Sequence, residues 1–261
     1  MKATSGFTLL EILVAAVVFS VLVLLLAQII AMTGLTIGIS QKKLDSAGQA
    51  RMVFSRLAAD FAARPRRSDL GMTFEKETGN DSFRFYSGVA GHGAGASPRN
   101  ISLVEYRVQE STPGRTFQLE RGATATGWDT GSPQPNFNTY TLPSPNTADY
   151  DVFDTGIFRL EFVYILNTDS PSSRISNTAA ADYSDVASVI VTIAVLDEKS
   201  RSLLTDAQVG QLAAKFTDAA DGQEPIVEWS KQLSKPDDFP ADIPRSVVQG
   251  IHLYQGVFHV R

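Results

Sequence analysis

The chain has 261 residues, of which 43% are hydrophobic, and its formal net charge is −5 at pH 7. This length is sufficient for one sizeable domain beyond an N-terminal segment. The absence of cysteine excludes disulfides and thiolate metal sites. No block of basic residues is present to follow a phosphate backbone, which argues against nucleic acid as a ligand of the main domain.

The N-terminus combines a short polar segment, residues 1–6, with an apolar run over residues 7–30. As a helix this run is about 36 Å long, enough to cross a hydrocarbon core of about 30 Å. Lys2 is the only charged side chain before the run, so the positive-inside rule predicts a cytoplasmic N-terminus, although Lys42 and Lys43 beyond the run weaken that inference. A simple membrane anchor is the plainest interpretation.

Glu11 distinguishes the segment from an ordinary anchor or a signal peptide. A charged side chain within a membrane span costs several kcal/mol unless it is paired, so Glu11 requires a cationic partner. A secretory signal peptide would place small residues and a cleavage site after the apolar core, whereas here Gly6 comes before it.

Residues 6–11, with the sequence G-F-T-L-L-E, resemble the processing site of type IV prepilins and type II secretion pseudopilins. The resemblance implies that a prepilin peptidase cleaves between Gly6 and Phe7 and methylates the new N-terminus of Phe7. Glu11 then becomes the fifth residue of the mature chain and meets the N-terminal amine of a neighbouring subunit. An amine and a carboxylate stabilise each other in lipid, where neither is tolerable alone.

The helix is predicted to continue beyond the membrane. Residues 31–64 contain no proline, and Pro65 provides a stop, so we expect one helix over residues 7–64. Its second half is amphipathic. The expected apolar stripe consists of Phe54, Leu57, Ala58 and Phe61, and the expected polar face consists of Arg51, Ser55, Arg56 and Asp60.

The remainder of the chain is predicted to be rich in strands. Strands are expected at residues 81–87, 101–108, 115–121, 157–166, 186–196 and 257–260. Most alternate apolar and polar residues, which indicates one solvent-facing side, and this places Arg159 and Glu161 on a wet face. Residues 186–196 are apolar on both faces and suggest a covered central strand. One further helix is expected after Thr205, which forms a capping-box pattern with Gln208.

The segments between these elements are long and rich in turn-forming residues. Irregular loops are expected at residues 88–100, 122–150, 167–184 and 218–246. Loops of this length are commonly functional or disordered.

These elements predict an α+β fold with an antiparallel sheet packed on the long helix. The arrangement resembles the pilin fold, in which a transmembrane and then amphipathic helix carries a β-rich head. The expected division is a leader at 1–6, a transmembrane helix at 7–30, an amphipathic continuation at 31–64 and a head at 65–261. Tyr106-Arg107 in one strand, followed by a strand ending in Leu119-Glu120-Arg121, is similar to the larger J-type minor pseudopilins.

Catalytic motifs are sparse. Asp154-Thr155-Gly156 matches the D-T-G of aspartic proteases, but it occurs once and is explained by a turn. A membrane-anchored hydrolase would need a second aspartate opposite Asp154. The histidines lack metal-binding spacing, so no enzyme activity and no cofactor are expected, while structural Ca²⁺ in an acidic loop is left open.

The resemblance implies a minor pseudopilin of a type II secretion-like system that acts by assembly into a periplasmic pseudopilus. Its partners would be the prepilin peptidase, other pseudopilins or pilins, the inner-membrane assembly platform and the lipid bilayer. It would be a single-pass inner-membrane protein with a periplasmic head. The alternative is a minor pilin of a type IV pilus, acting in adhesion, motility or DNA uptake.

Overall fold

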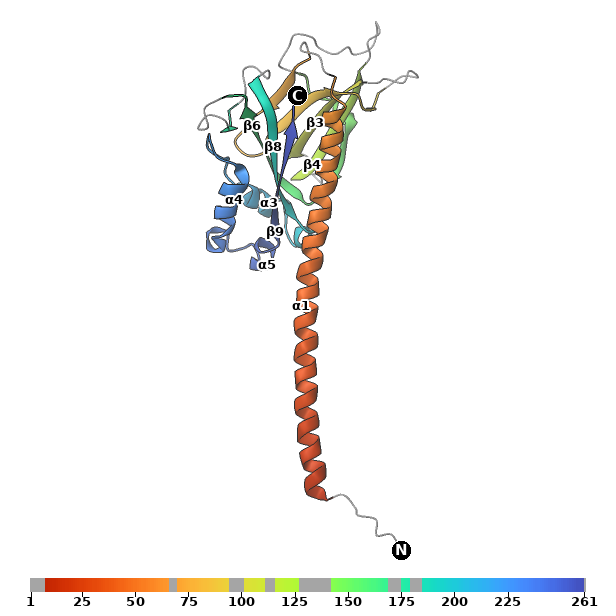
Figure 1. The fold of residues 1–261 in the computed structure, drawn as a ribbon, viewed down its shortest axis with the longest axis vertical. Coiled ribbons are helices and arrows are strands. Elements are labelled where there is room, and N and C mark those ends of the chain that lie inside the picture. The colour runs from red at the N-terminus through yellow and green to blue at the C-terminus, as the bar shows by residue number, and fades with distance from the viewer. Residues whose placement is uncertain are drawn as a thin grey trace. The chain divides into compact units, whose positions relative to one another are not determined.

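The computed structural model describes residues 8–65, 70–93, 101–110, 116–126, 142–168, 175–178 and 185–260, with the backbone alone for 34–39. The chain divides into two compact units, Met1–Leu44 and Asp45–Arg261. Helix α1, Leu9–Ala62, begins in the first unit and ends in the second. Figure 1 shows the elements in chain order.

Helix α1 confirms the continuous helix expected from the sequence. It passes through Gly34, Gly38 and Gly48 without interruption, although each glycine costs about 1 kcal/mol relative to alanine in a helix. It ends at Ala62, and Pro65 follows after one turn.

The first sheet is a meander of five sequential antiparallel strands. They are β1 (Met72–Glu75), β2 (Ser82–Ser87), β3 (Ile101–Gln109), β4 (Gln118–Thr126) and β5 (Tyr150–Asp154). A one-turn 3₁₀ helix, Thr147–Asp149, leads into β5. The expected strand at 115–121 therefore lies further along the chain, and β1 and β5 were not predicted.

The second sheet has four antiparallel strands in the order β7-β6-β8-β9. The strands are β6 (Ile157–Leu166), β7 (Ile175–Ser176), β8 (Val186–Leu196) and β9 (Ile251–His259). Strand β8 is buried along nearly its whole length and lies between β6 and β9, which confirms the prediction of a covered central strand. The head thus has two antiparallel sheets where the sequence suggested one.

A layer of short helices separates β8 from β9 in the chain. It consists of α2 (Glu198–Ser202), α3 (Asp206–Ala213), α4 (Pro225–Leu233), a 3₁₀ turn (Pro236–Asp238) and α5 (Arg245–Val248). The layer packs on the face of the second sheet opposite the C-terminal part of α1, residues 45–62 (Figure 1). Its core contains Phe158, Leu196, Val209, Leu212, Phe216, Trp229, Ile243 and Val247.

The capping box of α3 is present as predicted, with the Thr205 side chain accepting from the Gln208 backbone and the Gln208 side chain returning to Thr205. The interpretation of 218–246 as irregular was wrong. Helix α4 has proline at its first position and no side-chain N-cap bond, and it is stabilised by burial of Trp229. Packing of this kind is not visible in local sequence.

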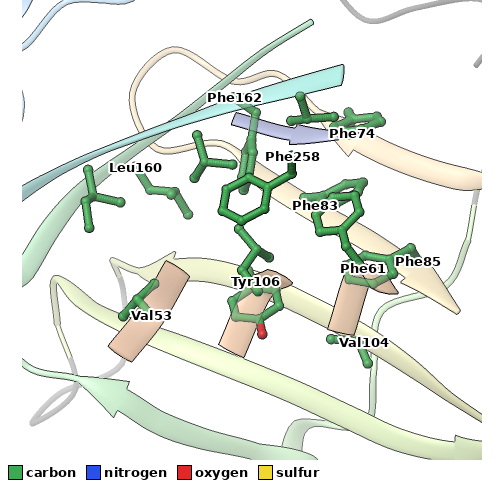
Figure 2. Packing of buried hydrophobic residues seen from close by; sticks show 14 of the residues in the cluster. Val53, Phe61, Phe74, Phe83, Phe85, Val104, Tyr106, Leu160, Phe162 and Phe258 are labelled. Carbon is green, nitrogen blue, oxygen red and sulfur yellow. The ribbon is translucent and has the colours of Figure 1, made fainter. Parts of the chain in front are cut away.

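The main core lies between the C-terminal half of α1 and both sheets. Phe61 of α1 stacks on Phe85 and Phe258, with ring centroids 4.8 and 5.7 Å apart. Phe83 joins this group and stacks on Phe74 at 4.1 Å (Figure 2). Aromatic contacts therefore hold strands of both sheets to one helix.

The buried face of α1 differs from the predicted stripe. Leu57 and Phe61 are buried as expected, but Ala58 is exposed and Asp60, placed on the polar face, has no exposed surface. The buried face instead follows Ala50, Val53, Leu57, Asp60 and Phe61. The α+β class, with a long helix followed by antiparallel sheets, is confirmed.

Candidate assembly site

The motif at residues 6–11 is described from Thr8 onward, and Gly6 and Phe7 lie outside the described residues. Thr8 and Glu11 form a reciprocal pair at the start of α1. The Glu11 backbone N–H donates to Thr8 Oγ1 at 3.3 Å, and the Thr8 backbone N–H donates to Glu11 Oε2 at 3.1 Å. This is a capping box, which satisfies two backbone donors that the first helical turn leaves unpaired.

The helix-capping role of Thr8 was missed in the sequence. The signal was available, because Thr8 and Glu11 have the same T-x-x-[EQ] spacing that identified Thr205 and Gln208. Glu11 thus has a structural role in its own chain. Its negative charge in the first turn also stabilises the helix by interacting with the positive end of the helix dipole.

The surroundings of Glu11 are apolar. The helix segment Leu9–Thr33 has a mean hydropathy of 3.0 and is long enough to cross a membrane. Glu11 lies on a shallow hollow along one helix face, whose other lining residues are Leu10, Val14, Ala15, Val18, Phe19 and Leu22. None of these is basic, and both hydrogen bonds from Thr8 reach Oε2, so Oε1 can accept from a donor on another molecule.

A second polar cluster joins α1 to the first sheet. Asp60 accepts from Tyr106 Oη at 2.6 Å and from Arg121 Nε at 2.7 Å, both at Oδ2, while Arg56 Nε lies 3.3 Å from Oδ1. Tyr106 and Arg121 are cross-strand partners of β3 and β4. Burial and the adjacent Asp60 carboxylate raise the pKa of Tyr106, so the phenol stays protonated and donates.

The Asp60 cluster explains the error in the predicted helix face. A buried carboxylate requires hydrogen-bond and charge partners, and Asp60 finds them in the Tyr106 hydroxyl and the Arg121 guanidinium. The structure therefore brings these residues together on the helix. The contacts have a structural role, because they fix α1 against the sheet.

The D-T-G segment forms the turn between β5 and β6. Asp154 Oδ1 accepts from the backbone N–H groups of Gly156, at 2.7 Å, and Ile157, at 3.1 Å. Burial raises the pKa of Asp154, and these two hydrogen bonds act in the opposite direction. An Asx turn accounts for all these contacts.

His92 and His259 each make a hydrogen-bond contact with one polar side chain. His92 Nε2 lies 2.8 Å from Asp151 Oδ2, and His259 Nδ1 lies 2.8 Å from Ser188 Oγ. Among the residues that the structure describes, no group of three or more His, Asp or Glu side chains is placed to hold a metal ion.

Comparison with known proteins identifies the N-terminal segment. Residues 1–27 match the family model described as "Prokaryotic N-terminal methylation motif". The comparison with curated proteins gives no match. Among solved structures, a type IV-like pilin from Thermus thermophilus is similar, with 10% identity, a TM-score of 0.39, and coverage of 81% of this chain and 94% of that chain. Residues 1–27, which include Gly6, Phe7 and Glu11, therefore carry a prokaryotic N-terminal methylation motif.

Proposed function

We propose that this chain is a type IV pilin-like structural subunit and, more specifically, a minor pseudopilin of a type II secretion-like system. The observation that carries the proposal is the match of residues 1–27 to the methylation motif, on a helix of membrane-spanning length. Its role is assembly and not catalysis. A prepilin peptidase cleaves after Gly6 and methylates Phe7, and the subunit enters a periplasmic pseudopilus.

Before assembly, the subunit resides in the inner membrane. Residues 7–30 span the bilayer, 31–64 continue the helix and 65–261 form a periplasmic head. The inner-membrane assembly platform extracts the subunit, and helix packing against other pseudopilins retains it. The similarity of the Tyr106 and Arg121 strands to J-type subunits supports the assignment to a minor pseudopilin.

Glu11 carries the assembly step by pairing with the methylated amine of Phe7 on a neighbouring subunit. The environment supports this role, since the helix face around Glu11 is apolar and Oε1 can accept a hydrogen bond. A carboxylate in such a medium gains far more from a cation than it would in water.

Two matched substitutions separate pairing from helix capping. Glu11→Gln keeps a residue that can complete the capping box but removes the charge, whereas Thr8→Val removes the cap and keeps the charge. We expect Glu11→Gln to reduce incorporation into filaments about tenfold or more, and Thr8→Val to retain most of it. Incorporation is measured by pull-down of epitope-tagged subunits from cells with an active prepilin peptidase.

Mass spectrometry of both variants provides the control, because each should show cleavage after Gly6 and a methylated Phe7. If Glu11→Gln assembles like the unmodified chain, the pairing role is wrong. An N-terminus that still begins at Met1 in these cells would refute the processing step.

Deletion of the gene for this chain tests the choice between a pseudopilus and a surface pilus. If the chain is a pseudopilin, the deletion strain should lose export of secreted proteins while any surface fibres remain. Loss of extracellular fibres with unchanged export would instead assign the chain to a type IV pilus.

A further inference from the structure

A pocket of about 430 Å³ opens in the head where the β1–β2 turn meets helix α3. Its volume is within the range of small-ligand sites. The walls come from three segments far apart in the sequence: Gly79 and Asn80 in the turn, Glu110 and Phe117 around the β3–β4 connection, and Phe216 and Asp218 after α3.

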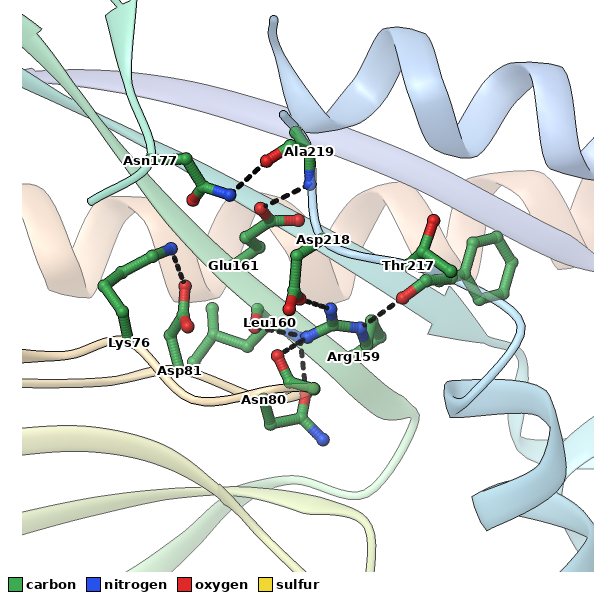
Figure 3. Close-up of polar contacts among 12 residues, drawn as sticks. Lys76, Asn80, Asp81, Arg159, Leu160, Glu161, Asn177, Thr217, Asp218 and Ala219 are labelled. Carbon is green, nitrogen blue, oxygen red and sulfur yellow. Dashed lines mark hydrogen bonds and ion pairs between the residues drawn. The ribbon is translucent and has the colours of Figure 1, made fainter. Parts of the chain in front are cut away.

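Beneath the pocket lies a hydrogen-bond network around the buried Arg159. This side chain has no exposed surface, and its guanidinium donates to the backbone oxygens of Phe216, at 2.9 Å, and Gly79, and to Asp218 Oδ1 (Figure 3). It also lies 5.2 Å from the ring centre of Trp229. The hydrogen-bond donors of Arg159 are thus used within the protein, and its charge is balanced by Asp218.

A second carboxylate at the pocket belongs to Glu110. Asn80 accepts from the Leu160 backbone N–H at 2.7 Å, which fixes the direction of its amide, and it donates to Glu110 Oε1 at 2.7 Å. The exposed Glu110 carboxylate is therefore held at the rim of the pocket and retains accepting capacity.

Phe117 forms an aromatic wall in a strained conformation. Its φ is +52°, and among the residues that the structure describes it is the only non-glycine residue with a positive φ. Residues held in this region cost roughly 1–3 kcal/mol and concentrate at functional sites. The ring packs closely on α3 at Gly210, where a Cβ would lie 3.0 Å from the Phe117 ring and would require a shift of a few tenths of an ångström.

Together these features select a ligand with a flat cationic group on an apolar stem. The pocket offers the Glu110 carboxylate at its rim, the half-buried Phe117 ring, and exposed apolar surface from Ala214. A guanidinium matches this set, because it can form a forked pair with a carboxylate and stack on an aromatic face.

We propose that this pocket binds an arginine side chain of a partner polypeptide, with Glu110 pairing with the guanidinium and Phe117 stacking on it. The site is separate from the N-terminal motif, and it gives the head a specific contact with a protein partner. The two proposals can therefore be tested independently. A negative result for arginine binding would leave the assembly role of Glu11 intact, and a negative result for Glu11 would leave the arginine site intact.

The test uses the full chain in detergent micelles and two capped tripeptides, Gly-Arg-Gly and Gly-citrulline-Gly. Citrulline has nearly the shape of arginine but no charge. We expect the arginine peptide to shift the methyl NMR signals of Ala213 and Ala214 and to saturate in the millimolar range, with the citrulline peptide binding about tenfold more weakly.

Glu110→Gln should weaken binding of the arginine peptide about tenfold. This variant should fold, since Glu110 is exposed and glutamine can still accept from Asn80. Glu198→Gln, at an exposed acidic position on α2, is the matched control and should leave binding unchanged. Equal affinity for both peptides, unchanged binding by Glu110→Gln, or no shift at the two alanines would each overturn the proposal.

Discussion

At the scale of single residues, Glu161 shows how burial raises the pKa of a carboxylic acid. It lies in β6 with no exposed surface, and Oε1 accepts from the Ala219 backbone N–H at 2.9 Å (Figure 3). Oε2 has no hydrogen-bond partner within the described structure. Burial raises the pKa of Glu161 to about 7, against the opposing influence of the Ala219 N–H, Lys76 and Arg159.

This pKa predicts a stability that falls as pH rises. The folded pKa is about 7 and the unfolded value is about 4.3, so the folded state binds more protons between these limits. The free energy of unfolding of the natural chain, minus that of Glu161→Gln, should therefore decrease by about 3 kcal/mol from pH 4 to pH 8. Denaturant titrations of both proteins across this range measure the difference.

A difference between the natural chain and Glu161→Gln that stays constant with pH would contradict this prediction, because it would show that Glu161 titrates normally in the folded protein.

The sequence pattern placed Arg159 and Glu161 on a solvent-facing side of their strand, and this was wrong. Alternation identified the strand correctly, but the face opposite the main core is covered by the helical layer, which buries both side chains. Alternation reports which residues share a face, and it does not report what else packs there. In contrast, the Thr8–Glu11 and Thr205–Gln208 capping boxes depend on local spacing and are readable from sequence.

At the scale of elements, the helical layer is tied to the second sheet through Arg159. Its donors reach the Phe216 carbonyl and the Asp218 carboxylate, which both lie between α3 and α4. In the same connection, the Trp229 indole donates to the Thr217 carbonyl at 3.0 Å. The segment between α3 and α4 is therefore held by side chains from the sheet on one side and from α4 on the other.

Replacing Arg159 with methionine should loosen this layer. The substitution leaves the Gly79 and Phe216 carbonyls without their donor, and we expect a loss of about 2–3 kcal/mol in the free energy of unfolding. Hydrogen exchange of the Trp229 indole N–H, followed by NMR, should accelerate accordingly.

Arg245→Met is the matched control, because Arg245 pairs with Asp237, whose side chain is 95% exposed, and such pairs contribute little. Equal effects of the two substitutions on Trp229 exchange would mean that Arg159 does not anchor the layer.

At the scale of the whole molecule, the head unit includes part of α1. Asp45–Arg261 forms a compact unit, and its core contains Ala50, Val53, Leu57 and Phe61 of the helix. The sequence predicted a docked helix and the α+β class, because helical period and strand alternation persist over long segments. It did not predict the division into two sheets, since that depends on the register shifts and pairings of distant strands.

A fragment of residues 45–261 should fold alone, with cooperative thermal unfolding followed by circular dichroism. A fragment of 66–261 lacks the helix, exposes the aromatic core around Phe83 and Phe258, and should aggregate or unfold without cooperativity. If both fragments melt cooperatively at the same temperature, the helix is dispensable for the head.

The separation of β8 from β9 by the helical layer has a consequence for the order of folding. The two strands pair along their length, yet residues 197–250 lie between them in the chain. Closing so long a loop is entropically costly and slow, so their pairing depends on contacts of high sequence separation. Until the last strand has been synthesised, β8, apolar on both faces, has one unpaired edge. The nascent chain therefore passes through an aggregation-prone interval in which that edge is exposed.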